Sequence, residues 1–317
     1  MKTFASAALW GVISAIPLLS QPALATDFKV AAVLPGVVTD KSFNQQVFEG
    51  LNAAKKSGGV DTAYSENVGQ AEQVEVMADY ARRGYNLIIG GGGEYIDAAR
   101  RIKAQFPDVQ VAVLNGAETD GITTLSFDHE QFAYVVGIVA GGMSTTGTVA
   151  AITAQPIPAF DYIVKGFTAG VHVTHPDGKI LTTLTNDWAD VAKAKAASFN
   201  LIGQGADVLL PYLDGAYLGV VQAADEKNVH VVGVSVDLAI DSPKANLLSL
   251  IQDYGAMAAW AIEHAKAGTL EGKRYNFGVG AFAGDMGAFN ETVPESVQQE
   301  VSKAVEDLKA GKIQLPK

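Results

Sequence analysis

Short apolar runs rich in β-branched residues alternate along this chain with longer amphipathic segments, and this alternation restricts the possible fold strongly. The apolar runs cover residues 28–34, 87–90, 109–114, 149–152, 180–184, 208–210 and 229–234. Helical periodicity occupies residues 45–56, 70–83, 95–105, 190–202 and 215–227. Apolar strands separated by helices predict an α/β fold, in which parallel sheets are covered by helices on both faces.

The two halves of the chain begin in a similar way. Residues 30–33 (VAAV) lead through a loop to Phe43-Asn44, and residues 149–152 (VAAI) lead through a loop to Phe160-Asp161. Such strand, loop and helix units are common, so the repeat is modest support for two similar halves. A length of 317 residues also favours two lobes over a single domain.

The first 25 residues have the pattern of a secretory signal peptide. Lys2 precedes an uncharged apolar run over residues 4–19, and residues 23–25 (Ala-Leu-Ala) supply a small-x-small cleavage site. A glycine and a proline interrupt the run, which weighs against a retained membrane span. We therefore expect the mature chain to begin near Thr26.

Composition narrows the cellular context and the partners. The sequence has no cysteine, so it predicts no disulfide, no thiolate metal site and no lipid-bearing cysteine. Loss of Lys2 with the signal peptide changes the formal net charge from −11 to −12, and an acidic surface disfavours nucleic acids and anionic membranes. We expect a soluble, unlipidated periplasmic protein with no nucleic-acid partner.

The loops that follow the strands are the expected place for a binding site. In an open parallel sheet, ligands bind beyond the carboxyl ends of the strands, where loops and helix N-termini present backbone N–H groups. These loops cover residues 35–44, 91–95, 155–161, 186–190, 212–214 and 235–240. If two such sheets face each other, the loops line a cleft.

The first loop contains Asp40, Phe43 and Asn44. Phe43 is well placed to stack on a flat ligand, while Asn44 offers a donor and an acceptor to the edge of that ligand. A plainer interpretation also fits, with Asp40 or Ser42 as the N-cap of the following helix and Phe43 as part of the core.

A second aromatic residue, Trp188, stands in the loop at residues 186–190. Its plainer interpretation is a hydrophobic staple beside Asp190 as N-cap. If both loops face the cleft, Phe43 and Trp188 come from opposite lobes and could sandwich an aromatic ring. A purine, which is planar and lined with hydrogen-bonding groups, would suit such a site.

Two aspartates and a glycine complete the candidate ligand contacts. Asp237 follows the last strand of the second half and could accept hydrogen bonds from two sugar hydroxyls, although Asp237 and Asp214 could equally be turn residues. Gly92 lies in a run of four glycines that would let the backbone approach a ligand. Tyr95 stands where a dinucleotide-binding loop requires glycine, so phosphate binding is not supported.

Catalytic, metal-binding and cofactor-binding patterns are missing from the sequence. The five histidines are scattered and form no H-E-x-x-H motif. A nucleoside hydrolase would need an aspartate cluster near the first strand, but residues 37–39 (Val-Val-Thr) leave Asp40 alone. We expect a binding protein that is not an enzyme, with no metal and no cofactor.

From about Phe28 onward the sequence resembles the basic membrane protein family of solute-binding proteins, which includes bacterial purine nucleoside receptors. The most specific element is residues 40–45 (DKSFNQ) with residues 49–51 (EGL), and further similarity lies at 106–109, 134–141, 166–170 and 205–208. The resemblance implies a type I periplasmic-binding-protein fold, with two doubly wound parallel-sheet lobes and three hinge crossings. We expect lobe 1 to comprise residues 26–124 and 245–275, and lobe 2 residues 125–244 and 276–317.

The same resemblance implies roles for particular residues. Phe43 and an aromatic near Trp188 would stack a purine base, Asn44 would read its edge and Asp237 would hold ribose. Gln252 stands where the family often has lysine, which leaves its contact open.

The resulting hypothesis is a monomeric periplasmic receptor for a purine nucleoside or nucleobase that delivers its ligand to an ABC-type permease. A ligand-sensing module that docks on a membrane receptor is the alternative. Lobe closure would couple ligand binding to docking on the permease, because only the closed form presents both lobes in the geometry that the permease recognises.

Overall fold

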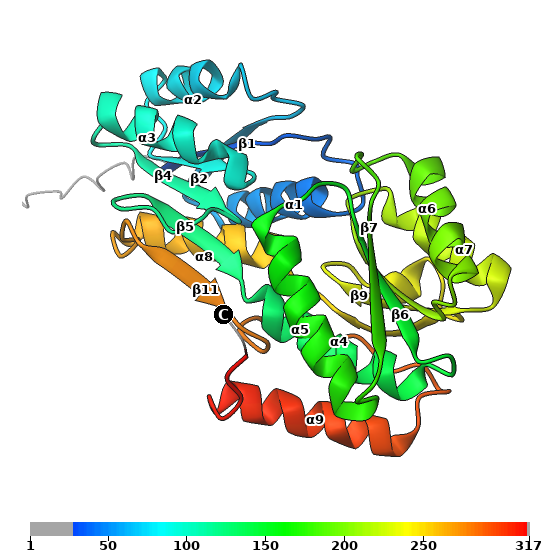
Figure 1. Ribbon diagram of the computed structural model, residues 1–317. Helices are drawn as coiled ribbons and strands as arrows, with labels where there is room; N and C mark the ends of the chain where they lie inside the picture. Colours follow the sequence, from blue (N-terminus) through cyan, green and yellow to red (C-terminus); the bar gives the residue numbers. More distant parts are fainter. Residues whose placement is uncertain (1–27, 316–317) are drawn as a thin grey trace, which may run out of the picture.

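The computed structural model describes residues 28–315, so the expected signal peptide at residues 1–25 lies outside the described part. The described chain forms two lobes, each a parallel sheet with helices on both faces (Figure 1). None of the helices between residues 28 and 315 combines the length and apolarity needed to cross a bilayer.

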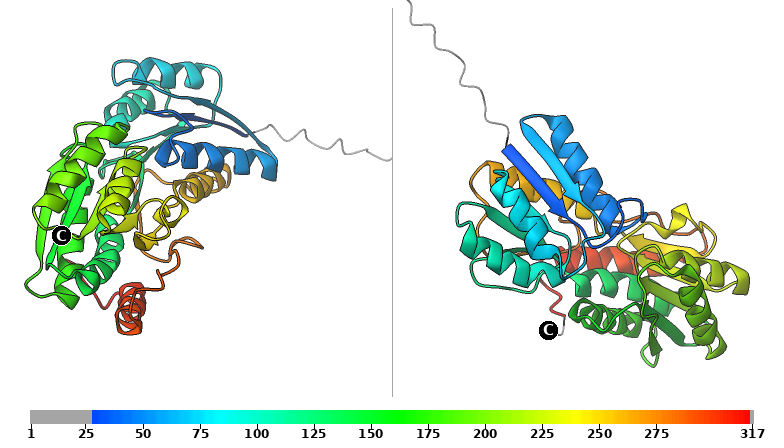
Figure 2. Two further views of the ribbon diagram at one scale, coloured as in Figure 1. Left: turned by 90° about the vertical axis from the view of Figure 1, so that its right-hand side faces the viewer. Right: turned by 90° about the horizontal axis from the view of Figure 1, so that it is seen from above.

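The first lobe contains a six-stranded sheet in the order β2-β1-β3-β4-β5-β11, in which every pair of neighbouring strands is parallel. Helices α1 and α8 cover one face, and α2 and α3 cover the other (Figures 1 and 2). The strands are β1 (Phe28–Val33), β2 (Val60–Ser65), β3 (Leu87–Gly90), β4 (Gln110–Leu114), β5 (Thr123–Phe127) and β11 (Arg274–Phe277). The helices are α1 (Phe43–Ser57), α2 (Gln73–Arg82), α3 (Ile96–Gln105), preceded by η1 (Gly93–Tyr95), and α8 (Tyr254–Lys266).

The second lobe contains a five-stranded sheet in the order β7-β6-β8-β9-β10, again parallel throughout. Helices α6 and α7 cover one face, α4 and α5 cover the other, and α9 packs on α4. The strands are β6 (Thr148–Thr153), β7 (Lys179–Leu184), β8 (Val208–Tyr212), β9 (His230–Val234) and β10 (Asn246–Leu250). The helices are α4 (His129–Met143), α5 (Pro158–Thr174), α6 (Val191–Gly203), α7 (Tyr217–Lys227), η2 (Leu238–Ile240) and α9 (Glu295–Lys309).

Both sheets place their second strand outside their first, so each has a topological switch point beside its first strand. In lobe 1 the switch point separates β1 from β3, and in lobe 2 it separates β6 from β8. Loops at such a point diverge in opposite directions and leave room for a ligand. The common strand order confirms the two doubly wound lobes that the sequence repeat indicates.

The chain passes between the lobes three times within residues 28–315, after β5, after β10 and after β11. The expected boundaries need one large correction and two small ones, because residues 125–127 and 276–277, assigned to lobe 2, belong to strands of the first sheet. Residues 245–275 were assigned to lobe 1, but Asn246 and Leu248 at the start of that segment pair with β9 in the second sheet. The backbone hydrogen bonds of β10 therefore place the crossing after Leu250, and β11 then returns the chain to the first sheet beside β5.

Helices α4 and α5 approach each other closely because glycines line their contact. A β carbon at Gly137 would lie 2.5 Å from the carbonyl oxygen of Phe167, and Gly166 and Gly170 face α4 in a similar way. These glycines belong to the segments 134–141 and 166–170 that carry the family resemblance. Their sequence pattern thus reflects helix packing rather than ligand contact.

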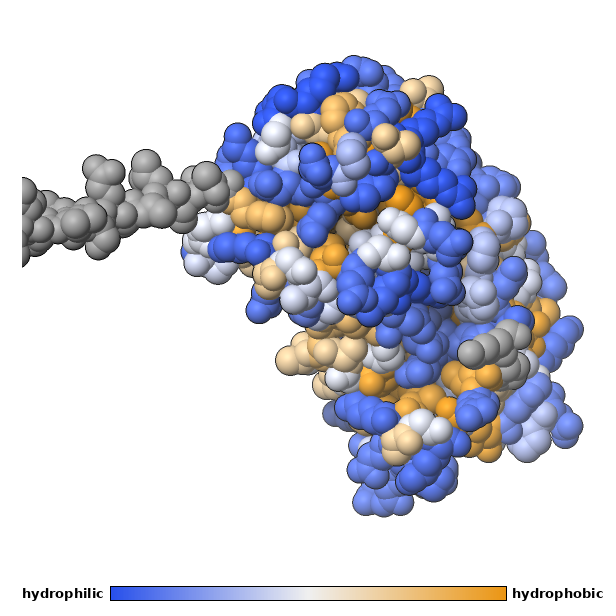
Figure 3. Space-filling model, turned by 90° about the vertical axis from the view of Figure 1, so that its left-hand side faces the viewer, coloured by the Kyte–Doolittle hydropathy of each residue, from blue (hydrophilic) through white to orange (hydrophobic). Residues whose placement is uncertain are grey.

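The surface is polar outside this core. The face drawn in Figure 3 is mostly hydrophilic, with apolar residues in small groups between polar ones. The net charge of −11 makes the protein acidic as a whole.

Candidate ligand-binding site

Loops at the carboxyl ends of the two sheets lie close together, and we call the region between them the cleft. Lys41 Nζ of lobe 1 lies 3.8 Å from Asp241 Oδ1 of lobe 2. A β carbon at Gly215, also in lobe 2, would lie 3.5 Å from the backbone oxygen of Asp40. The switch-point loops after β1 and β8 therefore face each other, as expected for a site between the lobes.

Asp40 organises the first of these loops. Its carboxylate accepts hydrogen bonds from the backbone N–H groups of Ser42, Asn44 and Gln45 at 2.9, 3.0 and 3.0 Å. These groups include free donors at the start of α1, so Asp40 supplies the cap, whereas the side chain of Ser42 makes no capping bond. The capping interpretation of Asp40 is confirmed.

Asn44 is held in the same network and is only 2% exposed. Its Nδ2 donates to Asp40 at 2.7 Å, and its Oδ1 accepts from the backbone N–H of Gly36 at 3.2 Å. These bonds leave one hydrogen of Nδ2 and one lone pair of Oδ1 for other partners. The primary role visible here is to fix the loop at residues 36–44.

Phe43 is the first of several aromatic residues that contact one another near the boundary between the lobes. Its ring is partly buried and packs edge to face on Tyr254, with 4.8 Å between ring centroids. Tyr254 also packs edge to face on Phe127 at 5.1 Å. Phe43 thus borders the core, as its plainer interpretation holds, but part of its ring remains accessible.

Trp188 occupies the corresponding position in lobe 2. It is partly buried against the core under α6 and α7, and its ring lies 6.5 Å from that of Tyr212 in an edge-to-face arrangement. The side chains of Tyr212 and Tyr254 interact with each other. The two tyrosines therefore connect Trp188 to Phe43 across the cleft.

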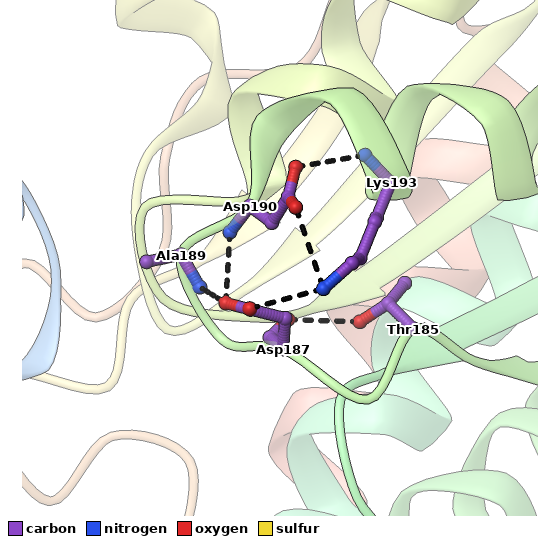
Figure 4. Close-up of polar contacts among 5 residues, drawn as sticks. All are labelled: Thr185, Asp187, Ala189, Asp190 and Lys193. Atoms are coloured by element: carbon purple, nitrogen blue, oxygen red, sulfur yellow. Dashed lines mark hydrogen bonds and ion pairs between the residues drawn. The ribbon is translucent and has the colours of Figure 1, made fainter.

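The loop that carries Trp188 is held by the polar contacts drawn in Figure 4. Asp190 caps α6 through the N–H of Lys193 at 3.0 Å, which confirms its predicted capping role. Asp187 accepts from the backbone N–H of Ala189 at 3.0 Å and from Lys193 Nζ at 3.3 Å, and these bonds hold the pKa of Asp187 below its usual value. Trp188 is thus presented by an ordered loop.

A neutral hydrogen-bond network forms the floor between the lobes. Gln252 is fully buried, with its Nε2 3.1 Å from His129 Nδ1 and its Oε1 3.2 Å from the hydroxyl of Tyr254. That hydroxyl also accepts from Asn115 Nδ2 at 3.0 Å. Burial lowers the pKa of His129 to about 4, an effect that the positive charge of Arg274 reinforces, so its imidazole is neutral at neutral pH.

Two carboxyl groups of lobe 1 act on Asp214 across the cleft. Burial, together with the charges of Asp40 and Glu94, raises the pKa of Asp214, which lies just before α7, to about 7. Desolvation also raises the pKa of Glu94. Because Asp40 and Glu94 belong to lobe 1 and Asp214 to lobe 2, their repulsion opposes close approach of the lobes.

The remaining two predicted residues have local roles in the described structure. Asp237 caps η2 by accepting the backbone N–H of Ala239 at 3.0 Å. Gly92 has a φ of 151°, and a β carbon there would collide with the carboxylate of Glu94. Glycine is favoured here by that φ, which residues with a side chain rarely adopt, more than by Glu94, whose flexible side chain could move aside.

Sequence reasoning missed several residues of the site. Tyr254 and His129 lie next to the lobe crossings, where no motif marks them, whereas Asn115 directly follows β4 and could have been found by inspecting every strand end. Among the described residues, no group of three or more histidine, aspartate or glutamate side chains is arranged to hold a metal ion.

A cleft between two similar doubly wound lobes, bordered by aromatic rings and floored by neutral polar groups, defines a two-lobed small-molecule binding protein. Residues 28–316 match the Bmp family, described as "ABC transporter substrate-binding protein PnrA-like", and the chain belongs to that family.

Curated relatives cover most of the chain at modest identity. Transcriptional activator protein med of Bacillus subtilis is 28% identical over 87% of this chain and 87% of its own. The ABC transporter nucleoside-binding protein BmpA of Lactococcus lactis is 26% identical over 92% of this chain and 90% of its own. A purine-binding protein of Brucella abortus is 25% identical over 80% of this chain and 72% of its own.

Solved structures agree with the fold. A solute-binding protein of an ABC transporter system from Aeropyrum pernix superposes with a TM-score of 0.80 at 19% identity, covering 92% of this chain and 94% of its own. A transcriptional activator of the comK gene from Bacillus halodurans gives 0.77 at 25% identity, covering 91% and 100%.

These neighbours confirm the type I periplasmic-binding-protein fold. Members of the family are substrate-binding proteins of ABC transporters and not enzymes. The family therefore implies a small-molecule ligand and a transporter permease as partners, with the binding protein on the outer side of the membrane.

Proposed function

We propose that the protein captures a purine nucleoside or nucleobase between its lobes for an ABC importer. The observation that carries this proposal is the aromatic series from Phe43 through Tyr254 and Tyr212 to Trp188, which crosses the cleft beside neutral amide groups. Planar heterocycles with hydrogen-bonding edges suit such surroundings. Relatives named as nucleoside-binding and purine-binding proteins support the same ligand class.

The charge of the cleft favours a ligand without phosphate. The carboxyl groups of Asp40, Glu94 and Asp214 lie in the cleft, and Lys41 at its edge lies beside Asp241. A nucleotide would bring further negative charge next to these carboxyl groups, at an electrostatic cost. We propose that Asp237 binds ribose hydroxyls when the ligand is a nucleoside.

Isothermal titration with adenosine, guanosine, inosine and the free purine bases tests the ligand class. We expect heat from at least one of them and none from the matching monophosphates. If no purine compound gives heat with ligand-free protein, the purine proposal is wrong and the fold stands unaffected.

Two truncations test the stacking role. Phe43→Ala and Trp188→Ala should each weaken binding of the purine by about 1–3 kcal/mol with little change in melting temperature. Tyr64→Ala is a matched control, because Tyr64 is an aromatic residue 41% exposed on the edge strand β2. A collapse of the melting temperature in the Phe43 or Trp188 variant would show that the ring supports the core instead.

A sensing role is the second candidate, because relatives in Bacillus subtilis and Bacillus halodurans are named as transcriptional activators. Deletion of the gene distinguishes import from sensing. Loss of labelled purine uptake on deletion supports import, whereas normal uptake with an altered transcriptional response to purines supports sensing.

We also propose that the protein acts as a soluble, unlipidated monomer in the periplasm after removal of residues 1–25. Cell fractionation and the intact mass of the native protein test this together. A mature N-terminus other than one near Thr26, or a dimer mass, would contradict the corresponding part.

A further inference from the structure

The side chain of Gln46 makes two hydrogen bonds that join three separate segments at the edge of the cleft. It extends from the first turn of α1 in lobe 1. Its Oε1 accepts the backbone N–H of Tyr254 at 2.9 Å, at the start of α8. Its Nε2 donates to the backbone oxygen of Ser235 at 3.3 Å, in the loop that follows β9 of lobe 2.

Ser235 has an unusual backbone conformation at that contact. Its φ is 103°, in a region that residues other than glycine rarely adopt and that persists only when surrounding contacts hold it. Its N–H donates to the oxygen of Leu250 at 2.9 Å, and its own oxygen accepts from Gln46. The loop is thus held from lobe 2 on one side and from lobe 1 on the other.

This loop leads directly to Asp237, two residues further along the chain. Bonds within lobe 2 hold this loop from one side, and the Gln46 bond joins it to lobe 1. The nearby ion pair between Lys41 and Asp241 is longer, at 3.8 Å, and the Lys41 side chain is 63% exposed, so it constrains the lobes less.

We propose that Gln46 is a positioning residue for lobe closure, which fixes the Ser235 loop in its cleft-facing conformation without itself being a ligand contact. The bond to Tyr254 orients the glutamine amide, and the bond to Ser235 breaks when the lobes separate. The proposal concerns the protein before any ligand binds, so it does not depend on the identity of the ligand.

The distance between the lobes in ligand-free protein tests this role. The chain has no cysteine, so Ala53→Cys on α1 and Ala196→Cys on α6, both exposed, give one spin label on each lobe without removal of native thiols. Pulsed electron paramagnetic resonance then measures the distribution of distances between the labels. The label pair is compared in wild-type, Gln46→Ala and Gln46→Glu backgrounds.

Gln46→Glu retains an acceptor for the N–H of Tyr254 but replaces the donor to Ser235 with a second oxygen. We expect both variants to reduce the ratio of closed to open protein about 3- to 10-fold, the effect of losing one hydrogen bond. Gln298→Ala removes a glutamine bond of the same kind, to the oxygen of Val293 at 2.8 Å, within lobe 2 only, and should leave the distribution unchanged.

A distance distribution in Gln46→Glu that matches the wild type would overturn the proposal, whatever the behaviour of Gln46→Ala. An equal shift in Gln298→Ala would also overturn it, because the effect would then not be specific to the cleft. Because the distances are measured in ligand-free protein, they test the role of Gln46 whether or not the protein binds purines.

Discussion

The carboxyl group of Asp214 should make the stability of the protein depend on pH. Burial, with the charges of Asp40 and Glu94 on the opposite lobe, raises its pKa from 3.8 to about 7. In the unfolded chain the group returns to its ordinary pKa. The ionised carboxylate is therefore disfavoured in the folded protein, and its replacement by Asn removes that penalty.

The sign and size follow from the two pKa values. For a pKa that is raised on folding, the contribution to stability is fully present below about pH 4 and is lost as the pH rises to about 7. The difference between these two pKa values corresponds to about 4 kcal/mol. Because Asp214 is only partly buried, solvent screening reduces this to about 2 kcal/mol. Asp214→Asn should match the wild type at low pH and exceed its stability by that amount above neutrality.

Urea unfolding of wild type and Asp214→Asn at about pH 4.5 and about pH 8 measures the difference. The exposed residue Asp108 provides a control, because Asp108→Asn should change stability equally little at both pH values. The reasoning is refuted if the stability difference between wild type and Asp214→Asn is the same at both pH values.

Two further substitutions test the packing and the polar framework of lobe 2. Gly137→Ala should destabilise the protein by about 1–3 kcal/mol in urea, because its β carbon would lie 2.5 Å from the oxygen of Phe167; unchanged stability would show that α4 and α5 can separate freely. Asp207→Asn should cost about 1–3 kcal/mol near neutral pH, since Asp207 accepts from Ser144 Oγ at 2.6 Å and Thr145 N at 2.7 Å. Burial alone would raise the pKa of Asp207, but these hydrogen bonds lower it below its ordinary value. The stability lost in Asp207→Asn should therefore shrink as the pH falls through that pKa. A loss of stability that grows in acid would contradict the stabilising role of these bonds.

Most of the strands found from the sequence are buried on both faces; the edge strand β7, with exposed or intermediate residues throughout, is the exception. Each of the seven predicted apolar runs overlaps a strand, and the residues of β3 and β8 are buried throughout. Burial on both faces leaves a continuous apolar run, which is the strongest signal a strand can give.

The elements that were not predicted give weaker signals. β2 lies at the edge of its sheet and has an exposed or intermediate residue at five of its six positions, and β5 (TTLSF) is buried although three of its residues are hydroxyl-bearing. Helix α4 carries apolar residues and glycines on several faces, because it packs against β9 and β10 as well as against α5 and α9. Amphipathic periodicity, which depends on one exposed face, cannot reveal such helices.

Some residues of the site could be predicted from the strand pattern and others could not. Asp40, Phe43, Gly92 and Asp214 lie in loops that follow strands beside a switch point, and the strand pattern alone leads to them. Tyr254 and His129 reach the cleft because the chain crosses between lobes next to them. The position of a crossing depends on which of the two sheets the next strand joins. An apolar run does not indicate the sheet, as the misassignment of β10 to lobe 1 shows. The neutral hydrogen-bond network around Gln252 therefore could not be predicted from the sequence and is visible only in the structure.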